Sequence, residues 1–320
     1  MSDASPRILL SGASGLLGSA VRHSLATQNQ PVLQLVRRSV SSPDELHWNP
    51  AGDPPFPAPG PLQNLAAAIH LSGSNVAAHR WTPAYKQQLT SSRVDSTRVL
   101  ATTLARLRQP PKAFLVASAT GIYGNRADQL LDEQSAPGSG FLAELCQQWE
   151  AAAQPAVDAG IRVVHLRFGV VLGPASKSHP GAARRGALAK MLPIFRLGLG
   201  GPLGSGRQWM SWISLQDAVA AILFALQTPS LAGPVNLTAP NPVTNAEFTR
   251  TLARQLPRPA FFAAPAFALR LALGEMADEA LLSSARVLPA KLTAAGFQFT
   301  HPTIDLALSV ALAQQPRALS

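Results

Sequence analysis

The chain has little cysteine and no long hydrophobic run. Its 320 residues include one cysteine, Cys146, which excludes an intramolecular disulfide and is typical of proteins in a reducing compartment. Near the N-terminus the longest apolar run is Ile8-Leu9-Leu10, which is too short for a secretory signal. The apolar stretch 261–273 contains Pro265 and Arg270 and is too short to span a bilayer. These absences predict a cytoplasmic protein that does not enter a membrane.

Acidic residues are also scarce: there are 17, against 27 lysines and arginines, and the formal net charge is +10. Only Arg37-Arg38 and Arg184-Arg185 are adjacent, and no basic stripe carries interleaved aromatic residues. We therefore expect no nucleic acid partner and attribute the charge to small anionic ligands. No Cys/His cluster has the spacing of metal ligands and no nucleophile elbow occurs, so we expect no metal site.

Strand-like and helix-like segments alternate over residues 1–173. Strands are expected at 7–11, 31–37, 67–71, 113–118 and 162–168, with helices at 15–28, 82–107 and 140–158. The proline-rich segment 43–61 is interpreted as a surface connection. This alternation predicts an α/β fold built on a Rossmann-type, doubly wound parallel sheet.

The pattern changes after Gly173. Residues 174–320 are expected to form a smaller, α-rich portion against the carboxyl ends of the strands, where a substrate cleft would lie. A helix near 215–227 and a strand at 235–237 indicate that the chain re-enters the first domain between about 207 and 240.

The first strand runs into a turn with three regularly spaced glycines. Gly12 allows a sharp turn, Gly15 lets the backbone approach a pyrophosphate, and Gly18 lets the next helix pack closely on the sheet. A tight turn without a ligand is the alternative, but the position between a strand and a helix favours a dinucleotide site. The residues expected to bind the cofactor here are Gly12, Ser14, Gly15, Leu16, Leu17 and Gly18.

Arginines stand where the second strand ends. An NAD-selective fold normally has Asp or Glu here to bind the ribose 2′-hydroxyl, whereas Arg37 and Arg38 suit a 2′-phosphate. A solvated basic turn is the alternative. We predict that the first domain, residues 1–173, binds NADP(H).

Blocks along nearly the whole chain carry a family resemblance. They are 12–18, 68–73, 80–82, 92–97, 117–124, 141–146, 166–173, 186–193, 198–213 and 236–247. On these blocks the chain resembles the atypical extended short-chain dehydrogenase/reductases of the "epimerase family", some of them labelled cell-division-inhibitor homologues. The resemblance implies the family's C-terminal domain at about 247–306. Residues 174–185 are longer than the expected Gly-rich link and are interpreted as a surface insertion near the cleft.

The usual catalytic pair of short-chain dehydrogenases is missing. These enzymes use Tyr-x-x-x-Lys, in which the lysine lowers the tyrosine pKa, but neither Tyr85 nor Tyr123 has a lysine four residues later. The expected position holds Cys146, and Glu150 one helical turn later should raise the pKa of its thiol. Cys146 is therefore either a neutral acid facing the substrate or a core residue on the apolar stripe of its helix.

Two further catalytic candidates follow the strand at 113–118. Ser118 stands where the fold places its catalytic hydroxyl, and Tyr123 is a candidate acid on the next loop. A turn-capping serine and a packed aromatic ring are the alternatives. His70, inside an apolar strand, is interpreted as a core or near-cofactor histidine.

More residues are expected beside the cofactor. Leu71, Ser72 and Gly73 should pass under the nucleotide, where a side chain larger than serine would clash. Arg93 is expected to meet the cofactor phosphates or an acidic substrate, with a surface salt bridge as the alternative. Arg167 is expected to bond the cofactor or a loop.

The glycine-rich block 198–213 is the substrate-side candidate. Arg207 offers a fork for phosphate or carboxylate and Trp209 an aromatic face; the alternative is that Trp209 and Trp212 anchor the small portion. Lys190 is a candidate stand-in charge. Asp217 is expected to cap or complement a helix N-terminus.

Two functions remain open from the sequence. The first is an NADP(H)-binding oxidoreductase or nucleotide-sugar epimerase-like enzyme acting on an anionic small molecule, with Ser118 orienting it, Cys146 or Tyr123 as acid and Arg207 binding its acidic group. The second is a non-catalytic NADP(H)-binding sensor or scaffold. A homodimer through the helices at 82–107 and 140–158 is expected by analogy with the fold alone.

Overall fold

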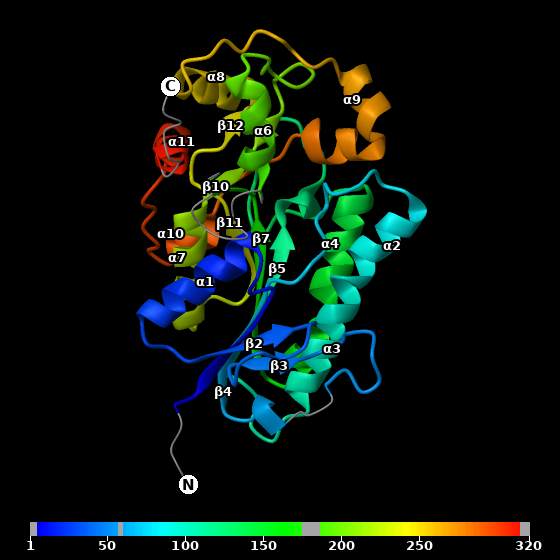
Figure 1. Ribbon diagram of the computed structural model, residues 1–320, viewed down its shortest axis with the longest axis vertical. Helices are drawn as coiled ribbons and strands as arrows, with labels where there is room; N and C mark the ends of the chain where they lie inside the picture. Colours follow the sequence, from blue (N-terminus) through cyan, green and yellow to red (C-terminus); the bar gives the residue numbers. More distant parts are fainter. Residues whose placement is uncertain (1–4, 57–59, 175–185, 314–320) are drawn as a thin grey trace.

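A seven-stranded sheet is the centre of the molecule. The computed structural model describes residues 5–56, 60–174 and 186–313. All seven strands are parallel, in the order β11-β7-β5-β4-β1-β2-β3 (Figure 1). They are β1 (Arg7–Ser11), β2 (Val32–Val36), β3 (Glu45–His47), β4 (Leu65–His70), β5 (Ala113–Ala119), β7 (Arg162–Phe168) and β11 (Gly233–Leu237). The order reverses at β1, so the predicted doubly wound Rossmann-type fold is confirmed.

Helices cover both faces of the sheet. One face packs against α1 (Leu16–Thr27), α7 (Leu215–Gln227) and α10 (Ala290–Ala294), and the other against α2 (Pro83–Ser91), α3 (Val94–Ala105), α4 (Phe141–Ala151) and α5 (Gln154–Asp158) (Figure 1). Within β1, Ile8 and Leu10 belong to the first layer and Leu9 to the second. This alternation follows from the two-residue period of a strand and explains why the apolar runs are continuous.

Two helices expected to be continuous are broken. The helix predicted at 82–107 is divided between α2 and α3, because the Ser92 hydroxyl donates to the Leu89 carbonyl and the Arg93 guanidinium donates to the same carbonyl. Side chains that bond nearby carbonyls in this way compete with the helical ladder. The helix predicted at 140–158 is likewise divided, at Ala152 and Ala153, into α4 and α5.

The proline-rich segment 43–61 is more than a surface connection. It contributes β3, the edge strand of the sheet, and it buries Trp48 and Phe56, which are 2% and 4% exposed. Their rings stack at 5.9 Å between centroids. The segment therefore covers the core beside β2, and that part of the prediction was wrong.

Beyond the carboxyl ends of the strands lies a smaller, mainly helical portion (Figure 1). It contains α6 (Ala187–Arg196), α8 (Asn245–Gln255), α9 (Ala266–Leu273) and α11 (Ile304–Ala313), with a π-helical turn at Ala277–Leu281. It has a separate hydrophobic core, whose largest buried side chains include Trp212 and Phe248. Short strand pairs link it to the sheet: β8 (Val170–Leu172) with β10 (Trp212–Ser214), β9 (Trp209–Met210) with β12 (Val243–Thr244), and β6 (Leu130–Leu131) with β13 (Arg286–Val287). Within the described ranges no helix is long and apolar enough to cross a membrane.

The C-terminal portion is attached to the start of α4. The Glu279 carboxylate accepts hydrogen bonds from the backbone N–H groups of Phe141 and Leu142, both at 2.7 Å, and Lys86 of α2 pairs with Glu275. A carboxylate at a helix N-terminus satisfies unpaired donors and complements the helix dipole. The position of α4 therefore depends on residues more than a hundred positions later in the chain.

Candidate functional site

The glycine turn joins β1 to α1 with almost no free space. Gly12 has φ +72°, and a Cβ there would lie 2.6 Å from the Leu71 carbonyl oxygen. A Cβ on Gly18 would lie 2.1 Å from the Gly12 carbonyl oxygen. Both positions therefore require glycine, one for its backbone angle and both for the close approach of neighbouring backbone.

The N-terminus of α1 lies at this turn. Gly15 is its N-cap, and no side chain in the described part of the chain caps the helix. Its first turn, which includes Leu16 and Leu17, carries no acidic residue. A Cβ on Gly15 would meet only the Gly12 carbonyl oxygen, at 3.3 Å, and Ser14 is exposed beside it. Unpaired N–H groups at a helix N-terminus bind anions, so this turn fits the pyrophosphate of a dinucleotide.

The two arginines after β2 have different surroundings. Arg38 forms a forked ion pair with Glu45 of β3, and hydrogen bonds from Arg38 lower the pKa of Glu45 to about 2. Arg37 is exposed, and its side chain has no hydrogen bond or ion pair to any part of the chain that the structure describes. Arg37 is thus available for a 2′-phosphate, whereas Arg38 is already engaged.

Arg93 lies under the loop that follows β4. Its guanidinium donates to the Ser74 carbonyl at 2.8 Å and lies over the Trp149 ring at 5.1 Å. A Cβ on Gly73 would be 3.3 Å from Arg93 Cζ. Arg93 is only 8% exposed and has no carboxylate partner among the described residues, so a surface salt bridge is wrong for this side chain. Burial lowers its pKa, and the loop 71–74 lies against a buried positive charge.

His70, the last residue of β4, is a core histidine. Its Nδ1 lies 2.6 Å from Ser11 Oγ and its Nε2 lies 3.2 Å from Ser96 Oγ. It is fully buried, and burial lowers its pKa to about 3, so the ring is neutral. Both ring nitrogens are satisfied, which favours a structural role.

A buried polar network occupies the position of the missing Tyr-x-x-x-Lys pair. Glu150 of α4 forms a forked ion pair with Arg167 of β7, at 2.8 and 2.9 Å, and accepts the Ser118 hydroxyl proton at 2.7 Å. Arg167 also donates to the Tyr123 hydroxyl at 2.9 Å, and that hydroxyl donates to Asn236 Oδ1 at 2.8 Å. The structure therefore brings together two of the predicted catalytic residues, Ser118 and Tyr123, with Arg167.

The network determines where its protons lie. The Ser118 proton is directed to Glu150, so its oxygen can only accept from a further partner. Burial raises the pKa of Tyr123, against the opposing charge of Arg167. Burial lowers the pKa of Arg167, but its hydrogen bonds and attraction to Glu150 outweigh burial and raise it overall. At neutral pH this is an ion pair flanked by two neutral hydroxyls.

Cys146 packs beside the network as an apolar side chain. It is 3% exposed and contacts a cluster that includes Ile122, Tyr123, Leu131 and Val287. Burial, and after it the charge of Glu150, raises the thiol pKa to about 12. The shift has the predicted direction, although burial is the larger cause. These surroundings favour a core residue over an acid that faces the substrate.

The single thiol makes that pKa directly testable. At pH 8 we expect native Cys146 to react with a thiol-exchange reagent roughly a thousandfold or more slowly than the unfolded chain, because the thiolate fraction is so small. The rate of colour release in buffer and in denaturant measures this ratio. Cys146→Ala supplies the background, and labelling of the native protein at the denatured rate would contradict the burial.

The substrate-side candidates are spread over several elements. Arg207 is exposed, and among the described residues its side chain has no partner; Trp209 is half-buried. Trp212 is fully buried and its indole N–H donates to the Asn241 carbonyl at 3.1 Å. Trp212 therefore anchors the small portion, which was the alternative to a role in substrate binding. Lys190 of α6 donates to the Ala77 carbonyl at 2.7 Å and so links the small portion to the loop after β4.

Asp217 is not the N-cap of α7. That role belongs to Ser214, whose hydroxyl accepts from the Asp217 N–H at 3.0 Å. The buried Asp217 carboxylate instead accepts from the N–H groups of Thr300 and His301, at 2.8 and 2.9 Å. It joins α7 to the last part of the chain. Of the predicted surface insertion 174–185, residues 175–185 lie outside the described residues. A Cβ on Gly173 or on Gly186, which flank the segment, would lie 3.2 Å from a methyl carbon of Leu16.

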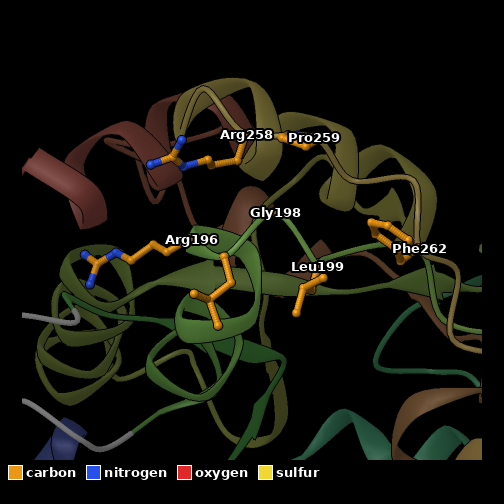
Figure 2. A pocket seen from close by; sticks show the side chains of 7 residues that line it. Arg196, Gly198, Leu199, Arg258, Pro259 and Phe262 are labelled. Carbon is orange, nitrogen blue, oxygen red and sulfur yellow. The ribbon is translucent and has the colours of Figure 1, made fainter.

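A shallow hollow of about 520 Å³ lies elsewhere, on the outer side of the small portion (Figure 2). Its lining residues are Arg196, Leu197, Gly198, Leu199, Arg258, Pro259 and Phe262. Gly198 and Leu199 belong to the predicted substrate-side block 198–213, but none of the predicted catalytic or cofactor-binding residues lines the hollow. The part of the chain that the structure describes contains no cluster of three His, Cys, Asp or Glu side chains that could hold a metal ion.

Sequence reasoning missed three polar residues at this site. Asn236 binds Tyr123, and its backbone N–H donates to buried Glu133 at 2.9 Å; Arg286 lies over the Trp209 ring at 4.1 Å. Asn236 was detectable as the polar member of an apolar strand. Glu133 and Arg286 have no local signal, because their partners lie far away in the sequence.

The chain has relatives along its whole length. Residues 8–237 match the NAD dependent epimerase/dehydratase family, and residues 264–311 match a domain of unknown function, DUF1731. The chain is 47% identical over 305 residues to epimerase family protein Mb2239 of Mycobacterium bovis, covering 95% of this chain and 97% of that protein.

Solved structures agree with this similarity. The crystal structure of human epimerase family protein SDR39U1 with NADPH superposes with a TM-score of 0.85 at 31% identity, covering 96% of this chain and 99% of that chain. A nucleoside-diphosphate sugar epimerase from Corynebacterium glutamicum superposes with a TM-score of 0.76 at 33% identity, covering 97% of this chain and 58% of that chain. The matched residues, the fold and the glycine turn agree, and the chain belongs to the NAD-dependent epimerase/dehydratase family, with a DUF1731 domain at its C-terminus.

Proposed function

We propose that this protein binds NADP(H) and acts as an oxidoreductase or nucleotide-sugar epimerase-like enzyme on an anionic small molecule. Two features of the described residues together carry the cofactor assignment: the α1 N-terminus has no side-chain cap, and the exposed Arg37 side chain has no hydrogen bond or ion pair. The first feature suits a pyrophosphate and the second a 2′-phosphate. The NADPH in the structure of human SDR39U1 supports the same assignment.

The cofactor contacts follow from the placement of the predicted residues. Gly12–Gly18 would hold the pyrophosphate, Arg37 the 2′-phosphate, and the loop Leu71–Gly73 the face of the nucleotide, with Arg93 adding positive charge beneath that loop. Arg167 would act through the network rather than on the cofactor, because Glu150 and Tyr123 already engage its guanidinium. When bound, the nicotinamide supplies hydride chemistry.

Among the three predicted catalytic residues, the contacts favour Ser118 as the group that orients the reacting oxygen. Its proton is held by Glu150, so it would accept a hydrogen bond from a substrate hydroxyl. Cys146 and Tyr123 have raised pKa values and would line the site as neutral groups. Arg207 and Trp209 would bind the acidic and apolar parts of the substrate, with Lys190 near the mouth of the site.

A second function, a non-catalytic NADP(H)-binding sensor, is favoured by one observation. Ser118, Tyr123 and Cys146 are at most 3% exposed, and Ser118 and Tyr123 are hydrogen-bonded to groups within the network. Single-turnover oxidation of bound NADPH by carbonyl compounds separates the two functions, because a sensor would bind the cofactor without oxidising it.

The cofactor assignment is tested by titrating the protein with NADPH and NADH while following nicotinamide fluorescence. We expect tighter binding of NADPH, and Arg37→Ala should weaken it about tenfold while leaving NADH binding unchanged, because a charge-assisted fork to the 2′-phosphate is lost. Arg38→Ala is the matched control and should have a much smaller effect, since Arg38 is already paired with Glu45.

Equal affinity for the two nucleotides would contradict the NADP(H) assignment, and binding of neither would contradict the proposed function itself. The expected homodimer through the face formed by α2 to α5 remains a proposal, and the molar mass in solution measured by light scattering tests it.

A further inference from the structure

An arginine outside the predicted site has the features of a ligand-binding group. Arg286 of β13 is half-buried, and its Nε is one of three buried side-chain nitrogen or oxygen atoms without a hydrogen-bond partner in the described ranges. No carboxylate of the described chain lies within salt-bridge distance of its guanidinium. A buried guanidinium donor without a partner is costly, because burial removes its hydration and nothing replaces it.

The guanidinium is held in a defined orientation. It lies over the Trp209 ring, 4.1 Å from the centroid, which leaves the edge of its plane to form hydrogen bonds. The backbone on each side is fixed, since the Ala285 N–H donates to the Trp209 carbonyl and the Val287 N–H donates to Ser211 Oγ at 2.8 Å. Arg286 is therefore preorganised before any ligand arrives.

Its place in the fold connects it to the candidate reaction site. The next residue, Val287, packs in the same cluster as Tyr123 and Cys146. Arg286 thus adjoins this cluster along β13, while its own side chain points to the opposite face of the strand, where it lies over Trp209.

Two other arginines belong to the segments that hold Arg286 and Trp209 in place. Arg207 is two residues before Trp209, and the Arg126 N–H donates to the Ser284 carbonyl at 2.8 Å, two residues before Arg286. Glu133, which lies two residues after β6, has a buried carboxylate, but this carboxylate accepts hydrogen bonds from the backbone N–H groups of Asn236 and Lys291 and not from Arg286.

We propose that Arg286, stacked on Trp209, is the binding site for the oxyanion of the substrate, a phosphoryl or carboxylate group bound through the guanidinium fork. This deepens the proposed function and rests on it for the identity of the ligand as substrate. Arg207, exposed at the rim, adds charge, while Arg286 sets the position of the anion. The free face of Trp209 takes the apolar or planar part of the same molecule.

The test uses protein saturated with NADPH, so that the cofactor site is filled. It is titrated at constant ionic strength with sodium pyrophosphate and, separately, with malonate, by calorimetry and by tryptophan fluorescence. We expect saturable binding of at least one anion. The anion that binds more tightly indicates whether the site prefers a phosphoryl or a carboxylate group. Arg286→Gln should weaken that binding about tenfold or more, and Arg286→Lys, which keeps the charge but not the fork, by less.

Arg250→Gln is the matched control, because Arg250 is exposed on α8 outside this site, and it should leave binding unchanged. Trp209→Phe should abolish the fluorescence change. Unchanged affinity in both Arg286 variants, each with a wild-type melting temperature, would overturn the proposal, as would no saturable binding of either anion.

Failure of the proposed function has a different signature. If the protein does not bind NADPH, the anion titration is made on the free protein. If Arg286→Gln then weakens anion binding and Arg37→Ala leaves it unchanged, the anion site at Arg286 is supported even though the protein does not bind the cofactor.

Discussion

Replacing Arg167 by methionine is expected to lower the free energy of unfolding by about 3–5 kcal/mol. The side chains of Arg167 and Glu150 are only 8% and 14% exposed. Without Arg167 the Glu150 carboxylate keeps its burial and the Ser118 hydrogen bond but loses the charge that balances it. Urea unfolding followed by circular dichroism measures the change.

Two variants make this result specific. Arg254→Ala removes an ion pair whose side chains are 69% and 53% exposed, and it should cost at most about 1 kcal/mol. The double variant Glu150→Gln/Arg167→Met removes both charges of this buried pair and should be more stable than Arg167→Met alone. A double variant that is less stable than Arg167→Met would show that the uncompensated carboxylate is not the cause.

Gly18→Ala is expected to destabilise the protein by about 1–3 kcal/mol and to weaken NADPH binding at least about tenfold. Alanine favours helix over glycine by about 1 kcal/mol, so propensity alone predicts the opposite sign. The steric clash should outweigh the gain in helix propensity, because the added Cβ would lie 2.1 Å from the Gly12 carbonyl oxygen and 2.9 Å from Ala13 Cα, both of them backbone atoms. Helix α1 would have to move away from the turn that is proposed to bind the pyrophosphate.

Gly60→Ala is the matched control, since a Cβ there meets nothing within 4 Å, and its stability should stay within about 0.5 kcal/mol of the wild type. Urea unfolding and the NADPH titration are made on both variants. A stabilised Gly18→Ala protein with unchanged NADPH affinity would contradict the tight packing of α1 on the turn.

Most of the sheet was predictable because its signals are local. The apolar run of β7 and the apolar period of α7 have the boundaries expected from sequence, Arg162–Phe168 and Leu215–Gln227. The break between α2 and α3 was not predictable, because the apolar pattern continues through it. The side chains that bond the Leu89 carbonyl there, Ser92 and Arg93, also bond the Ser74 backbone, 18 and 19 positions earlier. The burial of Trp48 and Phe56 in a proline-rich segment was missed for the same reason.

The candidate site divides in the same way. The glycine turn and the missing Tyr-x-x-x-Lys pair can be stated from neighbouring residues alone. The role of Tyr123 cannot, because its partner Asn236 lies 113 positions away, and two adjacent arginines become different only when β3 brings Glu45 beside Arg38.

Neighbouring residues were enough to establish the alternation of strands and helices in the sheet, the glycine turn after β1 and the absence of the usual catalytic pair, because backbone conformation and apolar period are local properties. The three-dimensional contacts were needed to establish that Arg38 rather than Arg37 pairs with Glu45, that the Ser118 proton is directed to Glu150, and that Arg286 lies over Trp209 with no acidic partner among the described residues. Charges and hydrogen bonds are satisfied by whichever groups the fold brings into contact, and at this site those groups come from strands and helices far apart in the chain.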